Sequence, residues 1–386
     1  MNNFQFVNPT KIIFGKGEIK RLSKEIPAGK KVLIIYGGGT IKKTGLLDEI
    51  KEELKDYTTG EFGGIEPNPT YETLMQGVDF IRKENYDYLL AVGGGSVIDG
   101  TKFIAAAVLH TQDDPWKLVT DNKAVKNALP FGVVLTLPAS GSEMNGGAVI
   151  TRKSILTKLP FFGPALFPKF SILDPVYTYT LPDKQIVNGV IDSFIHIMEQ
   201  YMTFPVNAKV QDRFSEGLLS TLIEEGPEAL KDKENYDVRA NIMWAATMAY
   251  NGLIASGVPQ DWSTHMIGHE ITALYGLDHA ETLAIIFPSM LEVMKEDKRE
   301  KLLQYGRRVW NIDSSLPEDK SVSLTIEKTR GFFRTMGIKT GFKEHSMGAE
   351  VIDKIIASLE SHGMKKLGEK GTVTPDVVRK VLEMSL

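Results

Sequence analysis

Residues 86–99 read YDYLLAVGGGSVID, and the architecture expected for the chain follows from this segment. Its first half is a short, nearly continuous apolar run, which is typical of a strand buried on both faces of a sheet. Three glycines follow, and an amphipathic segment then extends to Leu109. A strand, a glycine turn and a helix in this order predict part of a parallel sheet built from βαβ units.

The same pattern recurs on both sides of this segment. Apolar runs at 31–36 and 131–137 predict two further strands, and amphipathic segments at 44–57 and 71–84 predict helices. Later in the chain the strand pattern fades, and residues with high helix propensity become abundant. We expect helices there at 185–202, 210–230, 237–256, 262–275 and 281–295, and from 298, 321, 349 and 374 onward.

The chain is therefore expected to form two domains. Residues 1–183 are predicted to form an α/β domain, a parallel sheet with helices on both faces, and residues 184–386 an all-helical domain. The length of 386 residues provides enough material for both cores.

Composition excludes several classes of protein. The chain has 45 basic and 49 acidic side chains and a formal charge of −4, which argues against a nucleic-acid partner. It has no cysteine, so a metal would need nitrogen and oxygen ligands. The N-terminus lacks the pattern of a signal peptide. The chain also has no apolar run of about 18 residues, so we expect no membrane span. We expect a cytoplasmic protein that does not bind membranes.

The glycine turn at 93–95 has two interpretations. Glycines before a helix let the backbone approach a ligand, and the free N–H groups of the helix bind phosphate, with Ser96 as a further donor. Asp99 is placed either to bond a ribose hydroxyl or to complement the helix dipole. Because the spacing is not GxGxxG, a plain tight turn explains the glycines equally well.

Two more loops follow expected strands. Residues 36–43 read YGGGTIKK and offer no carboxylate of the kind that holds the ribose in NAD-selective sites. Lys42 and Lys43 would suit a 2′-phosphate, although both are explained more simply as surface charges. Residues 136–143, TLPASGSE, offer hydroxyls for a ribose or a phosphate, or form only a turn. Three such loops favour a nucleotide site, because ligands of open α/β sheets bind beyond the carboxyl ends of the strands.

Histidines are concentrated in the expected helical domain. Asp192 and His196 are spaced i, i+4, as are His265 and His269, so each pair shares one helix face. His279 follows ten residues after His269. One Asp and up to three His suit a divalent ion, whereas a lone His is more often structural. The histidines without such neighbours, which we interpret as surface or structural residues, are His110, His345 and His362.

Together these motifs resemble the iron-containing (group III) alcohol dehydrogenase family, and within it the butanol-dehydrogenase-like branch. The resemblance runs along the whole chain and has a specific order and spacing. It includes NPTKIIFG at 8–15, EPNP at 66–69, GGGSVID at 93–99, ASGSE at 139–143, DP at 174–175 and the Asp/His motifs between 192 and 279. Ser140 departs from the Thr of many relatives but keeps the hydroxyl.

The resemblance implies a set of site residues. The metal, Fe²⁺ or Zn²⁺, would be held by Asp192, His196, His265 and His279. His269 would lie near the substrate, where we expect it to assist proton transfer. The pyrophosphate would lie on Gly94, Gly95 and Ser96, with Asp99 beside it. The ribose and nicotinamide would contact Thr136, Ser140, Asn145 and Lys158, and the 2′-phosphate would contact Gly37, Gly38, Gly39 and Thr40.

The resemblance also implies the fold and the activity. The fold would be that of dehydroquinate synthase and the iron-containing alcohol dehydrogenases, with NADP(H) on the first domain and the metal on the second. Hydride would pass between NADPH and short- to medium-chain aldehydes, at a metal that acts as a Lewis acid. The active site would lie in the cleft between the domains. A homodimer is expected, formed through the N-terminal strand between Phe4 and Phe14.

Three alternatives remain open. An NAD-dependent polyol (glycerol-like) dehydrogenase would be expected to carry an acidic residue in the first glycine turn. A dehydroquinate-synthase-like lyase would need several Arg, Lys and Asn residues near the metal. A protein that has lost its chemistry would be expected to lack a ligand, but all four positions are filled. A small, uncharged substrate is favoured by the apolar residues near the metal motifs, namely Phe194, Ile195, Met198, Trp262, Met266 and Ile267.

Overall fold

The computed structural model describes residues 1–386 and divides into two compact units. The sheet unit comprises Val7–Pro182 and Asp232–Thr247. The helical unit comprises Met1–Phe6, Asp183–Lys231 and Met248–Leu386. These ranges differ from the expected 1–183 and 184–386 at the N-terminal segment and at the segment 232–247. Both exceptions depend on tertiary packing, which local sequence patterns do not encode.

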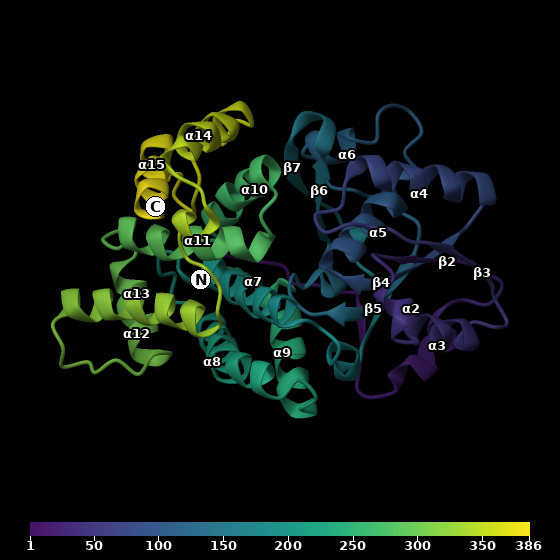
Figure 1. Cartoon of the computed structure of the whole chain (residues 1–386), viewed down its shortest axis with the longest axis horizontal. Helices are drawn as coiled ribbons and strands as arrows, with labels where there is room; N and C mark the ends of the chain where they lie inside the picture. The colour runs from purple at the N-terminus through teal and green to yellow at the C-terminus, as the bar shows by residue number, and fades with distance from the viewer. The chain divides into compact units, whose positions relative to one another are not determined.

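The sheet unit is built on six parallel strands in the order β1-β8-β5-β4-β2-β3. Figure 1 labels β2, β3, β4 and β5 of this sheet. A separate antiparallel pair is formed by β6 and β7. The expected strands at 31–36, 86–92 and 131–137 correspond to β2, β4 and β5. The strands are β1 Lys11–Phe14, β2 Lys31–Tyr36, β3 Thr58–Phe62, β4 Tyr88–Gly94, β5 Phe131–Leu137, β6 Gly147–Arg152, β7 Thr157–Phe162 and β8 Phe170–Leu173.

Helices cover both faces of this sheet, as the sequence predicts. Because successive side chains of a strand point to opposite faces, Leu33 and Leu89 join one core and Val32 and Leu90 another. The first core includes α4 and α5, and the second includes α1, α2 and α3. The helices are α1 Leu22–Glu25, α2 Thr40–Lys43, α3 Leu46–Glu53, α4 Tyr71–Glu84, α5 Gly95–Ala107 and α6 Lys117–Thr120.

Helix α7 is packed inside the helical unit, because almost every residue from Ile186 to Tyr201 is buried. The helix expected at 237–256 ends earlier, at Ala249, and is followed by turns in which Gly252 and Gly257 have positive φ. The helices are α7 Asp183–Tyr201, α8 Lys209–Lys231, α9 Tyr236–Ala249, α10 Ser263–Tyr275, α11 His279–Val293, α12 Arg299–Arg308, α13 Glu318–Thr335, α14 Ile352–Ser361 and α15 Pro375–Met384. Residues 236–247 of α9 belong to the sheet unit.

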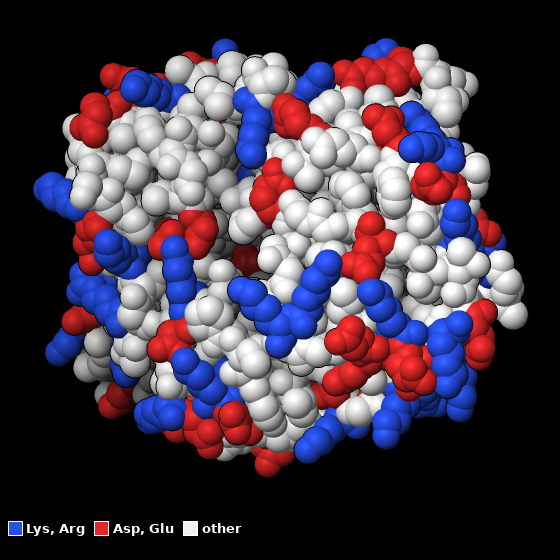
Figure 2. All heavy atoms as spheres, turned by 45° about the vertical axis from the view of Figure 1, so that its right-hand side comes forward, with Lys and Arg blue, Asp and Glu red and all other residues white.

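Short 3₁₀ helices connect these elements. They are Glu18–Arg21, Ser142–Met144, Lys153–Ile155, Pro164–Leu166, Pro175–Thr178, Phe342–His345 and Ala349–Val351. No helix combines the length and the apolar character that crossing a bilayer would require. On the face shown in Figure 2, basic and acidic side chains are interspersed, and neither sign forms a continuous field.

Candidate functional site

Three helices of the helical unit bring a carboxylate and two imidazoles together. Asp192 lies on α7, His265 on α10, and His279 is the first residue of α11. Their potential ligand atoms all lie within 4.8 Å of one another. Asp192 Oδ1 lies 3.9 Å from His265 Nε2 and 3.8 Å from His279 Nε2. Three of the four expected metal ligands therefore converge.

The fourth expected ligand, His196, adjoins this cluster. Its Nδ1 lies 3.4 Å from Asp192 Oδ1, and its ring centroid lies 4.5 Å from that of His265. The ring stacks on Tyr250. Burial lowers the pKa of His196 to about 4, so at neutral pH it is the neutral imidazole that binds metals.

The polar atoms of this cluster fit a divalent cation. Asp192 Oδ1 and His196 Nδ1 are both buried and have no hydrogen-bond partner. Buried polar atoms without a partner are costly, and a cation between them would satisfy both. A mixed set of carboxylate oxygen and imidazole nitrogen suits Fe²⁺ and Zn²⁺ alike. These residues fit the metal that the family resemblance implies, and they suit Fe²⁺ and Zn²⁺ equally.

His269 lies beside the cluster on the same helix as His265. Its ring centroid is 5.1 Å from that of His279 and 6.4 Å from that of His265. The residue is buried. His269 therefore lies next to the converging ligand atoms, but it does not contribute one of them.

The apolar residues near the metal motifs divide into two groups. Trp262 and Met266 remain partly exposed, and the Trp262 ring lies 5.2 Å from that of His265. Trp262 also has a positive φ of 64°, a strained conformation for an aromatic residue. The others are fully buried core residues, so Phe194, Ile195, Met198 and Ile267 give no information about the substrate.

Glu199 also belongs to this site, although it was not among the site residues predicted from the sequence. Its carboxylate accepts the backbone N–H of Thr264 at 2.7 Å and that of His265 at 3.3 Å, and it also contacts His265 Nδ1. Burial raises the pKa of Glu199 to about 8, and the negative charge of Asp261 adds to the rise. The spacing Asp192-x3-His196-x2-Glu199 continues one helix face, which is the signal that would have identified it.

A capping box fixes the start of α11, where His279 lies. The Asp278 side chain accepts a backbone N–H of the first turn, and the Glu281 side chain accepts the N–H of Asp278. Lys184 of α7 lies 2.8 Å from Asp278 Oδ2. These contacts tie the helix that carries His279 to the helix that carries Asp192.

The glycine turn of the sheet unit leads directly from strand to helix. β4 ends at Gly94 and α5 begins at Gly95, and no side chain caps the helix. A Cβ on Gly95 would lie 2.4 Å from Ser140 Oγ, so the loop after β5 approaches this turn closely. An uncapped helix N-terminus at the carboxyl end of parallel strands is suited to bind phosphate.

Other expected cofactor residues gather around this helix start. The N–H of Asn68 donates to Ser96 Oγ at 3.3 Å, and Lys158 Nζ donates to Asn68 Oδ1 at 2.8 Å. A Cβ on Gly37 would lie 3.6 Å from Val97, so the first glycine turn lies next to the second. Thr136 lies near the carboxyl end of β5, at the same edge of the sheet.

Asp99 and Asn145 are engaged in bonds within the protein. Asp99 accepts the Ser142 hydroxyl at 2.6 Å and the Val149 N–H at 2.9 Å. Asn145 Oδ1 accepts Lys102 Nζ at 3.0 Å. Both residues therefore brace α5 against β6 and the loop before it, a role that neither interpretation of Asp99 foresaw. Their contacts with the cofactor stay a prediction.

Lys102 is the buried centre of this bracing. It is 0% exposed, and its Nζ also donates to the carbonyl oxygens of Asn145 and Gly147 at 2.9 and 2.7 Å. Burial lowers the pKa of Lys102 to about 8, while the charges of Asp99 and Glu143 oppose the shift. Nothing in the sequence indicated that Lys102, which lies on a largely apolar helix, would be buried.

A carboxylate stands beside the first glycine turn. Glu61, on β3, has Oε2 2.9 Å from Tyr36 Oη and 3.1 Å from Lys42 Nζ, and it also contacts Lys51. Lys51 is the main cause that lowers the pKa of Glu61 to about 2. The turn itself, Gly37–Gly39 and Thr40, contains no acid, but the neighbouring strand places one against Lys42.

The remaining histidines are not part of the converging set. His362 Nδ1 lies 2.8 Å from Glu270 Oε1, and His110 contacts Asp113. Burial lowers the pKa of His345. These contacts agree with their interpretation as surface or structural residues.

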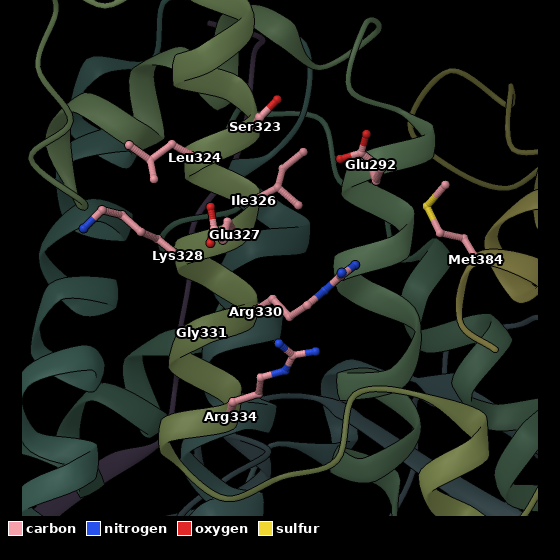
Figure 3. A pocket seen from close by; sticks show the side chains of 10 residues that line it. All are labelled: Glu292, Ser323, Leu324, Ile326, Glu327, Lys328, Arg330, Gly331, Arg334 and Met384. Atoms are coloured by element: carbon pink, nitrogen blue, oxygen red, sulfur yellow. The ribbon is translucent and has the colours of Figure 1, made fainter.

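The helical unit also has an open groove of about 750 Å³. Arg330 and Arg334 of α13 extend into it in Figure 3, opposite Glu292 of α11. None of the expected site residues lines it.

Two family models match the chain. "Iron-containing alcohol dehydrogenase" matches residues 9–175, and "Fe-containing alcohol dehydrogenase family, C-terminal" matches residues 186–383. Together they span both the glycine turns and the histidine cluster.

Individual relatives are similar over their full length. The NADPH-dependent aldehyde reductase YqhD of Escherichia coli is 54% identical over 385 residues, which cover 99% of each chain. A probable NADH-dependent butanol dehydrogenase of Bacillus subtilis is 41% identical over 100% of each chain. The crystal structure of E. coli YqhD matches with a TM-score of 0.98, covering 100% of this chain and 99% of that one.

Proposed function

The chain belongs to the iron-containing alcohol dehydrogenase family, and we propose that it is an NADPH-dependent aldehyde reductase. It would transfer hydride between NADP(H) and short- to medium-chain aldehydes or alcohols. The observation that carries the proposal is the convergence of Asp192, His265 and His279 within 4.8 Å. The relative that is 54% identical uses NADPH according to its name, whereas the one at 41% uses NADH. The higher identity favours NADPH.

The metal would be held by one carboxylate and three imidazoles. When bound, Fe²⁺ or Zn²⁺ supplies a Lewis acid for the carbonyl oxygen of the substrate. Asp192 contributes the single negative charge of the set, and His196 is neutral because burial lowers its pKa. The capping box that begins at Asp278 holds the helix that presents His279. The proposed ligands are Asp192, His196, His265 and His279.

The nucleotide would lie along the carboxyl edge of the sheet. NADPH supplies the hydride when it is bound. The uncapped start of α5 at Gly94, Gly95 and Ser96 would receive the pyrophosphate. The first glycine turn and Thr40 would receive the 2′-phosphate, with Lys42 as its counter-ion. The ribose and nicotinamide would be contacted by Thr136, Ser140, Asn145 and Lys158.

His269 is proposed to deliver the proton that completes reduction. A neutral imidazole can both donate and accept near neutral pH. Its ring lies 5.1 Å from that of His279, so it is close to the proposed ligands without being one of them. In the reduction direction a ring nitrogen of His269 would give its proton to the substrate oxygen.

A homodimer and a cytoplasmic location are part of the proposal. β1 is an edge strand, and the exposed rings of Phe14 and Trp244 lie 6.0 Å apart beside it. Exposed apolar side chains along an unpaired strand edge are typical of an interface between protein chains. Analytical ultracentrifugation should give twice the mass of 42.8 kDa. A Phe14→Glu variant should sediment as a monomer.

The activity is tested by cofactor oxidation with butyraldehyde. Chelator-stripped protein should be inactive, and added Zn²⁺ or Fe²⁺ should restore turnover with NADPH and much less with NADH. Turnover with NADH alone would contradict the choice of cofactor but keep the chemistry. Full activity after complete metal removal would contradict the role of the Asp/His cluster.

One observation keeps an NAD-dependent polyol dehydrogenase as the second candidate. That alternative expects an acid at the first glycine turn, and Glu61 lies beside the turn, 3.1 Å from Lys42. NAD-linked oxidation of glycerol that exceeds NADPH-linked reduction of butyraldehyde would favour this candidate.

A further inference from the structure

Glu199 makes a set of contacts that surface carboxylates do not make. The residue is 3% exposed and comes from α7, the helix that carries Asp192 and His196. It reaches across to the first turn of α10, where the N–H groups of Thr264 and His265 would otherwise lack partners. A carboxylate at a helix N-terminus also matches the helix dipole. Its position is therefore fixed by the backbone of a second helix.

The same carboxylate contacts the imidazole of His265 at Nδ1. In its ionised form, which a cation bound nearby favours, the carboxylate can only accept, so this contact places the imidazole proton on Nδ1. The lone pair is then on Nε2, the nitrogen that lies 3.9 Å from Asp192 Oδ1 in the cluster. Metal-binding histidines commonly donate their other ring N–H to a carboxylate, which fixes both the tautomer and the ring orientation.

The surroundings keep Glu199 in this place. Its backbone carbonyl accepts the N–H of Asp261 at 2.9 Å. The Asp261 side chain accepts Lys298 Nζ at 2.6 Å, and Lys298 also donates to the carbonyl of Met202 at 2.7 Å. Both side chains of this ion pair are nearly inaccessible to solvent. A buried ammonium thus holds the loop between α9 and α10 against the end of α7.

We propose that Glu199 is a positioning residue for the metal: its carboxylate, anchored on the N–H groups of Thr264 and His265, accepts the Nδ1 proton of His265 and turns Nε2 toward the ion. The proposal rests on the metal site of the proposed function and adds a residue to it. Glu199 itself is not one of the residues whose ligand atoms converge.

The test is metal affinity, which requires no turnover. Zn²⁺ and Co²⁺ are titrated into apo protein against a chromophoric chelator, and the Co²⁺ absorption spectrum reports ligand geometry. Glu199→Gln keeps the size of the side chain and replaces one carboxylate oxygen with an amide NH₂ group, which cannot accept the Nδ1 proton. We expect binding that is about 10- to 100-fold weaker, and an altered Co²⁺ spectrum.

Glu270→Gln is the matched control. Glu270 lies on α10 and is as buried as Glu199, and its Oε1 also lies within hydrogen-bond distance of a histidine Nδ1, that of His362, at 2.8 Å. The substitution makes the same chemical change in a pair that contains no proposed ligand. We expect its metal affinity to stay within about twofold of the wild type.

The outcomes separate the proposals. Wild-type affinity in Glu199→Gln, or equal loss in both variants, would overturn the positioning role. If Glu199→Gln does not fold, Glu199→Asp decides by the same comparison, because it keeps the charge but shortens the reach to His265. An apo wild type that binds no metal contradicts the metal site as a whole. A wild type that binds metal but reduces no aldehyde contradicts the activity and leaves the role of Glu199 intact.

Discussion

Glu61 is the side chain through which the choice of cofactor can be tested. It pairs with Lys51 and with Lys42, which lies in the helix after the first glycine turn, so a 2′-phosphate bound there has to compete with its carboxylate. Glu61→Gln should therefore tighten NADPH binding roughly two- to fivefold, the range expected for a partly exposed ion pair. NADH lacks the 2′-phosphate, and its Kd should not change. Fluorescence titration of both cofactors measures this.

Lys42→Gln is the complementary variant. It removes the cation rather than its internal competitor, so NADPH should bind more weakly while NADH is unaffected. Weaker NADPH binding in Glu61→Gln would instead mean that Glu61 orders the lysines for the phosphate.

His269 is the candidate for proton delivery, and its removal should affect the chemical step. His269→Gln should lower kcat for aldehyde reduction by about 100-fold, a typical contribution of a general acid. Metal content should stay near the wild-type value, because the converging ligand atoms come from other residues. Elemental analysis and the pH profile of kcat measure both effects. An unchanged profile with full kcat would exclude the proton relay.

The site residues that the sequence predicts have partners nearby in the chain, whereas those found only in the structure have distant partners. Asp192 and His196 are four residues apart on one helix, so their common face can be inferred from the sequence. Glu61 and Lys102 act through partners that are far away in the chain, Glu61 on Lys42 and Lys102 on Asn145. A single sequence does not show such pairs. Glu199 is intermediate, because its helix face was visible but its contact with His265 was not.

The helix α5 carries both the candidate phosphate site and a buried charge. Burial lowers the pKa of Lys102 to about 8 from 10.5 in the unfolded chain. Between these values the unfolded state binds more protons than the folded state, so the free energy of unfolding rises with pH. The penalty for burying the charge is fully present below about pH 8 and is relieved by about pH 10.5.

This dependence is isolated by comparing the wild type with Lys102→Met in urea unfolding at several pH values. The difference between the two free energies should be constant below about pH 8. It should then shift in favour of the wild type by on the order of 3 kcal/mol as the pH approaches 10.5. Titrating groups away from Lys102, including the buried tyrosines, are common to both proteins and cancel. A difference that does not vary with pH would mean that the pKa of Lys102 is the same in the folded and unfolded states.

Strands and helices were predicted best where one periodicity extends over the whole element. The central strands β2 and β5 were predicted at their observed residues, because both faces of each are buried and the sequence is continuously apolar. β3 reads TTGEF and is a partly exposed edge strand, so it carries no such signal. The hairpin of β6 and β7 was also missed, because its strands read GAVITR and TKLPFF and have neither a continuous apolar run nor a regular alternation.

The two units divide the proposed chemistry between them. All four proposed metal ligands belong to the helical unit, and all the proposed nucleotide contacts belong to the sheet unit. Neither unit could be assigned the whole reaction from its sequence, because each set of motifs suits several functions when taken alone. The joint order of both sets along one chain is what made the resemblance to the family specific.

This division predicts that each ligand stabilises its own unit. A ligand at 100 times its Kd stabilises the state that binds it by about 2.7 kcal/mol. Trp116 lies in the sheet unit and Trp310 in the helical unit, so variants that retain one of them report each unit separately. Saturating Zn²⁺ should raise the urea midpoint of the Trp310 signal, and NADPH should raise that of Trp116. If both signals move together with either ligand, the chain unfolds as one cooperative body, and the two units are not independent in stability.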